Sequence, residues 1–459
     1  MEKDIRKRKQ QSTNKHSKAS LYRTVWRWHF YAGIMIAPFL LILAITGSIY
    51  LFKPEIEQVL YQDYYEIKAE GDTLTPSNQI EEVKAAYPDA TITSFNPGET
   101  PTRSSEVGIT SNNEAATAFV NPYTGEVIGT LNSGDKIMNK IEEIHGELMA
   151  GTIGDRIVEL AASWGIVLIV TGLYMWLPRK KLRLAGVLYP RRKNGPQTFR
   201  RDLHAVTAFW LAGGMLFLIM TGLPWSGLWG NNFQIAATNA GTGYPPSIWT
   251  GSPPSSDVKA KDIAEVPWAA EQLDVPSSDL QGYRPLSVDD VVSIAQREEV
   301  HPSYTIYIPN EKEGVFTLSA FPPKAQQEVT MHIDQYSGAI LADYRFDDYG
   351  IVGKSVALGI TLHTGNQFGL LNKVISLFIC LGIILVIVSG FYLWRKRKPN
   401  QRSMGAPKAG SIKEGRTFLI VMAALGILFP LVGLSLVVVL LLDLLVIQRI
   451  PSWKKFLNA

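Results

Sequence analysis

The chain has few of the residues that bind metals or nucleotides through simple motifs. Cys380 is the only cysteine among 459 residues, which excludes an intramolecular disulfide framework and any cluster that several thiolates of this chain would ligate. No glycine-rich fingerprint of a P-loop or a dinucleotide fold occurs, so we do not expect a bound nucleotide. Any redox chemistry would therefore depend on a bound cofactor, and the histidines are the ligands placed to hold one.

Charge is scarce as well. Asp, Glu, Lys and Arg make up 19% of the chain, and they are nearly absent from several long apolar runs. About 20 consecutive apolar residues are needed to cross the hydrocarbon core of a bilayer as a helix. We therefore predict an integral membrane protein with soluble segments between its spans. The runs lie at about 30–52, 155–177, 203–224, 370–394 and 417–447.

Lysine and arginine gather on the flanks of these runs and predict the orientation, because basic loops stay in the cytoplasm. We expect the N-terminus inside, segments 53–154 and 225–369 outside, and the first run to remain as an uncleaved anchor. This topology accounts for the small positive excess of the chain, so no nucleic-acid partner is expected. The basic clusters are Lys7–Lys18, Arg179–Arg183, Arg191–Lys193 and Arg395–Lys398.

The fifth run is ambiguous because Pro430 lies near its middle. It could form one kinked, tilted helix that ends outside, or a broken hairpin that returns Lys454 and Lys455 to the inside. We expect the single kinked helix, since two full crossings would need about 40 residues plus a turn.

An internal repeat in the first four runs places four histidines at matched positions. A histidine at the start of each of runs one and three is followed 18 residues later by the glycine of a Thr-Gly pair. Runs two and four are each preceded by a histidine that lies 27 residues before the glycine of a Thr-Gly or Ser-Gly pair. The matched residues are His29 with Gly47, His204 with Gly222, His145 with Gly172, and His363 with Gly390.

The outer segments repeat too. Asn121–Gly125 and Asp334–Gly338 are turn motifs followed by strand-like stretches, and short helical patterns at Ile80–Ala86 and Val288–Arg297 precede them. The predicted fold is an α-helical membrane bundle, with four core spans plus a fifth C-terminal helix. Two small α+β extracytoplasmic domains complete an internal tandem repeat, and an insertion at 225–285, rich in Gly, Pro, Ser, Asn and Trp, lies before the second domain.

The matched histidines carry the strongest functional signal. Hydropathy places His29 and His204 at the cytoplasmic ends of their helices, and His145 and His363 at the outer ends. A membrane histidine is costly unless it is paired, hydrogen-bonded or metal-bound. Two same-depth pairs fit two hemes, each with one axial histidine from either side. All four are predicted to bind the cofactor and to ligate its iron; without a Cys-x-x-Cys-His motif, the hemes would be b-type.

Other interpretations of this pattern stay open. The repeat could simply preserve helix ends, and the Thr-Gly and Ser-Gly pairs could serve helix packing as well as the approach of a flat porphyrin. Zinc or copper is the competing metal, but either would need three or four converging ligands, whereas the pattern offers two at each depth. We assign no catalytic nucleophile, acid or base.

Weaker candidates surround the histidines. Four arginines could pair with heme propionates, although topology alone accounts for them; they are Arg23, Arg27, Arg200 and Arg201. Aromatic residues of the insertion could form an interfacial belt or a substrate platform; they are Trp225, Trp229, Tyr244 and Trp249. Glu159 and Lys373, inside apolar runs, are expected to reach the interface. The other histidines, which are His16, His301 and His332, are not expected to be ligands.

At these residues the sequence resembles the PepSY-associated transmembrane family, and within it the bacterial inner-membrane ferrisiderophore reductases. The resemblance covers nearly the whole chain except the basic tail and the fifth run. It implies two hemes b held by the four matched histidines, and outward electron transfer that reduces a ferric siderophore or another ferric chelate and releases Fe(II) for uptake. The motifs that carry it are Trp26–His29, His145 with Gly151, Asp202–His204, Leu362–Gly365, Asn121–Gly125 and Asp334–Gly338.

The electron donor would be a quinol or a cytoplasmic reductant, and the location the bacterial inner membrane with the PepSY-like domains outside. The expected layout is a basic cytoplasmic tail (1–20), span one (21–52), a first PepSY-like domain (53–140), an outer histidine segment with span two (141–178), a cytoplasmic loop (179–202), span three (203–224), the insertion (225–285), a second PepSY-like domain (286–350), an outer histidine segment with span four (351–395), a cytoplasmic loop (396–416), span five (417–447) and a C-terminal tail (448–459).

Two functions of other classes remain. The chain could be a transporter-like component of iron uptake, although such repeats commonly break helices at the middle of the membrane. It could also be a membrane-anchored peptidase regulator, since PepSY domains are associated with peptidase inhibition. That function gives no reason for four histidines in two depth-matched pairs.

Overall fold

The structure is a computed structural model that describes residues 2–178, 184–243, 258–278, 284–397, 403–407 and 416–458, with the side chains of 2–20 and Thr417 excepted. The basic cluster at Arg179–Arg183, Tyr244 and Trp249 therefore lie outside the described residues, as does the side chain of His16. The chain divides into two compact units. The helical unit comprises Met1–Ser48, Ile144–Trp229 and Ile375–Ala459, and the sheet unit comprises Ile49–Glu143 and Gly230–Val374.

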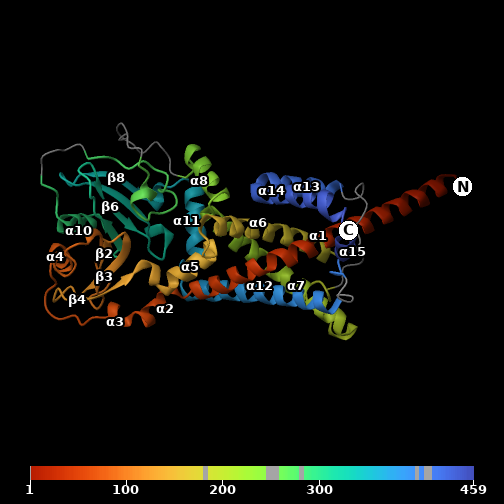
Figure 1. Ribbon diagram of the computed structural model, residues 1–459, viewed down its shortest axis with the longest axis horizontal. Helices are drawn as coiled ribbons and strands as arrows, with labels where there is room; N and C mark the ends of the chain where they lie inside the picture. Colours follow the sequence, from red (N-terminus) through yellow and green to blue (C-terminus); the bar gives the residue numbers. More distant parts are fainter. Residues whose placement is uncertain are drawn as a thin grey trace. The chain divides into compact units, whose positions relative to one another are not determined.

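Long apolar helices form the helical unit (Figure 1). Five helices of the described residues are long and apolar enough to cross a membrane, which confirms a multi-pass membrane protein. The candidate spans are Leu21–Tyr50, Gly151–Trp176, Pro196–Trp225, Leu370–Arg397 and Pro430–Ile447. The α-helices that form all or most of each span are α1 (Glu2–Tyr50), α6 (Gly151–Trp176), α7 (Pro196–Gly222), α12 (Leu370–Arg397) and α14 (Pro430–Leu442).

Aromatic side chains hold the helical unit together. Trp28 of α1 stacks on Trp164 of α6 with ring centroids 6.4 Å apart, and Trp176 of α6 stacks on Phe209 of α7 at 3.8 Å. The Trp164 indole N–H donates to Ser435 Oγ of α14 at 3.0 Å. Because water is absent from the bilayer core, these close contacts and the bond between polar side chains supply the association between helices.

The fifth apolar run differs from the expected single helix. It is broken into α13 (Arg416–Leu428) and α14, which a π-helical turn (Asp443–Ile447) and α15 (Pro451–Leu457) follow. Phe429 has an extended backbone at φ −119° and ψ 93°, as expected for a residue that precedes proline. Gly426 and Gly433 pack so closely that a Cβ atom on Gly433 would lie 2.5 Å from the Gly426 carbonyl oxygen. The helices α13 and α14 therefore form a hairpin at this break, and Figure 1 labels them next to each other.

Both ends of this hairpin return to one place on α1. Arg27 donates to Pro407 O at 2.9 Å, before α13, and to Asn458 O at 2.7 Å, after α15. The 13 residues of α13 rise only about 20 Å, less than the roughly 30 Å of a hydrocarbon core. The prediction of one kinked helix is wrong because hydropathy and total length do not show where a run reverses.

An eight-stranded antiparallel sheet is the centre of the other unit, in the order β4-β3-β2-β1-β5-β6-β7-β8. The two four-stranded halves join where β1 pairs with β5, with Phe95 opposite Ile306. The strands are β1 (Thr91–Asn96), β2 (Ser105–Ser111), β3 (Glu114–Val120), β4 (Val127–Asn132), β5 (Tyr304–Tyr307), β6 (Val315–Ala320), β7 (Val329–Asp334) and β8 (Ile340–Arg345).

Each half begins with a helix, α4 (Pro76–Ala86) or α10 (Val288–Arg297), as the sequence predicts. Both helices pack on the same apolar core as the sheet. The predicted turns are present: Gly125 N–H donates to Asn121 O, and Gly338 N–H donates to Asp334 O. Both glycines have positive φ, 76° and 72°, a conformation that other residues rarely adopt.

Part of the insertion covers a second face of this sheet. Ala260, Trp268 and Val275 form a buried cluster with Tyr344 of β8 and Val356. The other α-helices among the described residues are α2 (Lys53–Leu60), α3 (Gln62–Tyr65), α5 (Ile137–Glu147), α8 (Trp229–Asn239), α9 (Ala260–Ile263) and α11 (Ile351–His363). From Gly230 onward, the described parts of the insertion thus belong to the sheet unit.

Candidate cofactor site

His29 of α1 lies against the Thr171-Gly172 pair of α6. Its Nδ1 atom is 2.8 Å from Thr171 Oγ1, and that hydroxyl donates its own proton to Val167 O at 2.6 Å. The hydroxyl therefore accepts the proton of Nδ1. The edge of the imidazole rests on Gly172, where a Cβ atom would lie 3.3 Å from His29 Cε1.

His204 of α7 lies against Ser389-Gly390 of α12 in the same way. Its Nδ1 atom is 3.0 Å from Val386 O and 3.2 Å from Ser389 Oγ. A carbonyl oxygen only accepts, so Nδ1 carries the proton here too. A Cβ atom on Gly390 would lie 3.1 Å from His204 Cε1, which is tighter than the contact at His29.

His145 of α5 repeats the arrangement with Thr46-Gly47 of α1. Its Nδ1 atom is 2.9 Å from Thr46 Oγ1, which donates to Ile42 O at 2.8 Å. A Cβ atom on Gly47 would lie 3.3 Å from His145 Cε1. Three of the four predicted ligands thus share one local geometry.

This geometry selects one tautomer of the imidazole. With the proton on Nδ1, the lone pair lies on Nε2, which is the form of histidine that binds a metal ion. Metal-bound histidines generally donate their other ring N–H to a carbonyl, carboxylate or water, which fixes the ring and raises its basicity. The hydroxyl and the glycine together therefore hold each imidazole in the tautomer that a metal ligand needs.

The predicted inner pair, His29 and His204, lies within the helical unit. His29 and His204 are close enough for an electrostatic interaction between their imidazoles, although they come from α1 and α7. His363 is the last residue of α11 and belongs to the sheet unit. The pairing of His145 with His363 therefore stays a prediction.

The sequence treated the Thr-Gly and Ser-Gly pairs only as small residues for close packing. In the structure, the hydroxyls of Thr46, Thr171 and Ser389 are also hydrogen-bond partners of histidines. The equal offsets in the repeat carried this signal, but the partner of each histidine lies on a different helix. His29 contacts the Thr171 pair and not the Thr46 pair of its own helix, which spacing along one helix does not reveal.

Most of the flanking arginines have partners within the chain. Arg27 donates to backbone carbonyls of the C-terminal segment, and Arg201 pairs with Asp202 at 3.1 Å. The Arg200 guanidinium lies 5.2 Å from the Tyr392 ring centroid. Arg397, a member of the basic cluster Arg395–Lys398, lies over Trp26 with its guanidinium 4.8 Å from the ring centroid. The predicted pairing of Arg27 with a propionate conflicts with its use as a clamp for these carbonyls.

Glu159 and Lys373, two charged residues inside apolar runs, each bind a partner within the chain. Glu159 of α6 is only 1% exposed, and its Oε2 atom accepts the backbone N–H groups of Leu228 and Trp229 at 2.9 and 3.1 Å. Lys373 pairs with Glu55 at 2.5 Å and is also buried. The expectation that these two side chains simply reach the interface is therefore wrong.

Of the aromatic candidates in the insertion, Trp229 is packed and Trp225 is exposed. Trp229 donates its indole N–H to Leu428 O at 3.0 Å, and its ring lies 6.0 Å from Phe429, so it packs on the tip of the hairpin. Trp225 is 40% exposed. Of the described members, only Trp225 is available to an aromatic platform.

Among the remaining histidines, His332 is fully buried in β7, and burial lowers its pKa to about 4. Its Nδ1 atom is 2.9 Å from Thr317 Oγ1. His301 is partly exposed and accepts the Ser303 N–H through Nδ1 at 3.2 Å. Neither lies near another group of ligands, because no three His, Cys, Asp or Glu side chains converge on a common point in the described chain.

A comparison with protein families identifies the family of the chain. The chain belongs to the family described as PepSY-associated TM region, which matches residues 26–397. The match spans all four predicted ligands and ends before the hairpin. Among curated proteins there is no significant match.

Proposed function

We propose that this protein is a membrane reductase that carries two hemes b and passes electrons to a ferric siderophore or another ferric chelate outside the cytoplasm. The observation that carries the proposal is the hydroxyl bond to Nδ1 at His29, His145 and His204. A transporter or a peptidase regulator has no use for three imidazoles held in the metal-binding tautomer.

The residues present fit a heme. Axial ligation needs two histidines, since the porphyrin supplies the other ligands, and the predicted pair His29 and His204 satisfies this number. The glycine beneath each imidazole leaves room that a side chain would fill. In this proposal His29 and His204 hold one heme, and His145 and His363 hold the other. A heme supplies reversible one-electron chemistry, and the chain tunes it through ligand basicity and burial.

The proposed substrate follows from the chemistry of iron release. Hard oxygen chelators bind Fe(III) tightly and the softer Fe(II) less well, so one-electron reduction loosens the chelate. The donor in this proposal is a quinol or a cytoplasmic reductant. We place the sheet unit outside the inner membrane of a bacterium and the N-terminus inside, because basic residues flank the spans on one side.

The repeat belongs to the same proposal. We interpret β1–β4 with α4 and β5–β8 with α10 as two PepSY-like copies, each inserted between a pair of spans. Matching element orders in the two halves and matching histidine geometries support a tandem unit that duplicated together with its cofactor.

An absorption spectrum of purified protein tests the proposal. Protein from heme-replete cells should show a b-type spectrum that dithionite reduces, and a ferric chelate such as ferrioxamine should reoxidise it. A colourless preparation would contradict the cofactor. A heme-bearing preparation that no ferric chelate reoxidises would contradict the reductase and favour another membrane redox function.

A further inference from the structure

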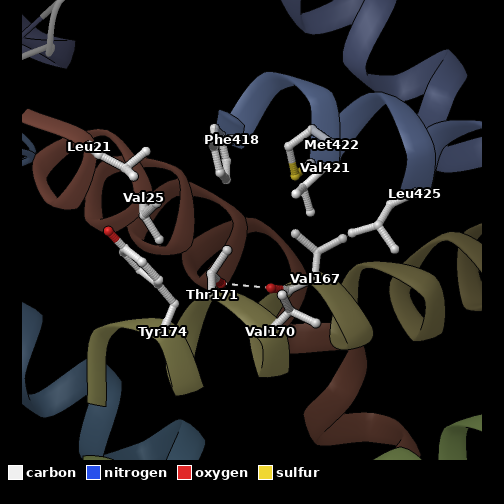
Figure 2. Close-up of a pocket in the computed structure, with 10 residues that line it drawn as sticks. All are labelled: Leu21, Val25, Val167, Val170, Thr171, Tyr174, Phe418, Val421, Met422 and Leu425. Carbon is white, nitrogen blue, oxygen red and sulfur yellow. Dashed lines mark hydrogen bonds between the residues drawn. The ribbon is translucent and has the colours of Figure 1, made fainter. Parts of the chain in front are cut away.

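A heme at the inner histidines needs partners for its propionates as well as for its iron. Heme b carries two propionates, which are anionic at neutral pH, and a carboxylate that leaves water needs a cation or hydrogen-bond donors beside it. The side of α6 that faces α13 offers no cation. Figure 2 shows this region as a hollow lined by aliphatic and aromatic side chains, with Thr171 and Tyr174 as its polar members. Cations for the propionates have to come from another side.

Arg397 is a cation on another side of α1. It is the last residue of α12, and its guanidinium lies 4.8 Å from the Trp26 ring centroid and 5.2 Å from the Phe30 ring centroid. With 3.6 residues per turn, the direction of His29 on α1 lies between that of Val25, which lines the hollow, and that of Trp26. Arg397 therefore reaches α1 at the level of the first inner histidine, on the side away from the hollow.

Arg200 lies in a similar position beside the second inner histidine. It precedes His204 by four residues on α7, so the two side chains lie on one face of the helix, one turn apart. The Arg200 guanidinium is 5.2 Å from the ring centroid of Tyr392. That tyrosine follows by two residues Gly390, the glycine that contacts His204. One arginine thus lies beside each helix that carries a predicted inner ligand.

The internal repeat supports Arg397 independently. Arg397 lies seven residues after Gly390, and Arg179 lies seven residues after Gly172, the glycine beneath His29. Seven residues make about two helical turns, so Arg397 lies on the same face of α12 as Gly390. Arg179 is outside the described residues. Along the sequence, an arginine therefore follows the glycine beneath each inner histidine at the same offset.

The two guanidiniums are free to bind an anion. Neither Arg200 nor Arg397 pairs with a carboxylate of the described residues. The aromatic rings contact these guanidiniums, and the N–H donors at a guanidinium edge can form two parallel hydrogen bonds with one carboxylate. Arg27 and Arg201, by contrast, already bind acceptors of this chain. The described arginines that do form ion pairs are Arg103, Arg156, Arg191, Arg201, Arg297 and Arg345.

We propose that Arg397 and Arg200 bind the two propionates of the inner heme, one guanidinium for each carboxylate. This inference rests on the proposed function and adds Arg397 to the residues of the inner site. It gives one member of the basic cluster Arg395–Lys398 a role in binding the cofactor in addition to its effect on topology. The same two arginines fix the direction in which the porphyrin edge faces.

Hemin dimethyl ester tests the proposal, because methyl esters replace both propionates while the porphyrin and the iron stay the same. Protein from heme-deficient cells is loaded in detergent with hemin or with the ester. Transfer to apomyoglobin then gives the rate of loss from the inner site, which is the kinetic phase that His29→Ala lacks. The variants are Arg397→Gln and Arg200→Gln. Arg395→Gln is the matched control, because Arg395 is an exposed arginine in the last turn of α12.

Arg397→Gln and Arg200→Gln should each lose hemin at least about tenfold faster than the wild type, because charge-assisted hydrogen bonds to one propionate are removed. Both should lose the ester at the wild-type rate, which also shows that they fold. Arg395→Gln should match the wild type with either compound. Wild-type rates of hemin loss in both variants, or faster loss of the ester from Arg397→Gln, would overturn the proposal. Failure of the wild type to bind hemin would instead contradict the proposed function.

Discussion

The Thr171 hydroxyl connects the His29 imidazole to the backbone of helix α6, with Oγ1 2.8 Å from His29 Nδ1 and 2.6 Å from Val167 O. The hydroxyl donates its one proton to the Val167 carbonyl oxygen, so a lone pair of Oγ1 accepts the N–H of His29. The same arrangement occurs at His145 and Thr46, on a different pair of helices. This bond is the physical basis for reading these histidines as ligands, and it can be removed without changing side-chain size.

Thr171→Val should weaken heme binding at the inner site, because valine keeps the shape of threonine and removes the acceptor of the Nδ1 proton. Loss of such a partner costs roughly 10- to 100-fold in metal affinity. Thr171→Ser keeps the hydroxyl and should retain the heme. Heme transfer to apomyoglobin measures the difference. Equal transfer rates for both variants would show that the hydroxyl does not support a ligand.

Gly390→Ala should disturb the His204 site. The added Cβ atom would lie 3.1 Å from His204 Cε1, and overpacking of this kind costs about 1–3 kcal/mol. Gly213→Ala on α7 is the matched control, since a Cβ there meets nothing within 4 Å. Heme content and thermal unfolding in detergent report the effect. If both alanine variants behave like the wild type, the imidazole does not need this glycine.

Arg27→Lys should loosen the C-terminal segment. The guanidinium donates to Pro407 O, Leu457 O and Asn458 O, and an ammonium group cannot reproduce that fork. Hydrogen bonds from charged groups contribute roughly 1.5–3 kcal/mol, and each 1.4 kcal/mol corresponds to about a tenfold change. Tryptic cleavage after Lys454 or Lys455 should therefore accelerate about tenfold. Arg23→Lys is the control, and equal cleavage rates in the two variants would refute the clamp.

Glu328 should make the stability of the sheet unit depend on pH. Burial raises the pKa of Glu328 to about 8, against a smaller lowering by the Tyr349 hydroxyl, so the folded chain holds this proton above pH 4.5 while the unfolded chain has released it. Stability due to this group therefore falls as pH rises from about 4.5 to 8, by about 1.4 kcal/mol per pH unit.

His332 acts in the opposite direction at lower pH. Its folded pKa is about 4, below the 6.5 of an unperturbed histidine, so its contribution to stability grows from pH 4 to 6.5. Between pH 6.5 and 8 only Glu328 of this pair titrates. Glu328→Gln should flatten the decline in this window, as measured by thermal unfolding of the full chain, whereas Glu311→Gln, an exposed control, should not. Parallel pH profiles for all three proteins would contradict the buried acid.

The sequence predicted elements whose signals are local. Helix α10 begins and ends at the predicted residues, Val288 and Arg297, because its apolar side chains recur at helical spacing and Ser287 caps it. The turns at Gly125 and Gly338 follow from the need for positive φ. Each of these elements is determined by residues a few positions apart.

Features that depend on distant residues were missed. The pairing of β1 with β5 joins strands about 200 residues apart, and nothing in either strand specifies the partner. The reversal at Phe429 depends on the contact of Gly426 with Gly433 and on the return of Asn458 to Arg27. Hydropathy measures neither of these.

The candidate site lies between these cases. The repeat identified His29, His145 and His204 because their spacing is regular, while their hydroxyl partners come from other helices. The sequence does not show which helices are neighbours. For that reason it predicts neither these hydroxyl partners nor the contacts that Arg27 makes with the C-terminal segment. The pairing of His29 with His204, which depth alone suggested, stays a prediction, as does that of His145 with His363.

A pyridine hemochrome count on the wild type and on single His→Ala variants tests the central claim most directly. We predict two hemes per chain in the wild type and one in each variant, with His29→Ala and His204→Ala losing the same spectral component and His145→Ala losing the other. Two hemes retained in both His29→Ala and His204→Ala, or none in the wild type, would contradict the account.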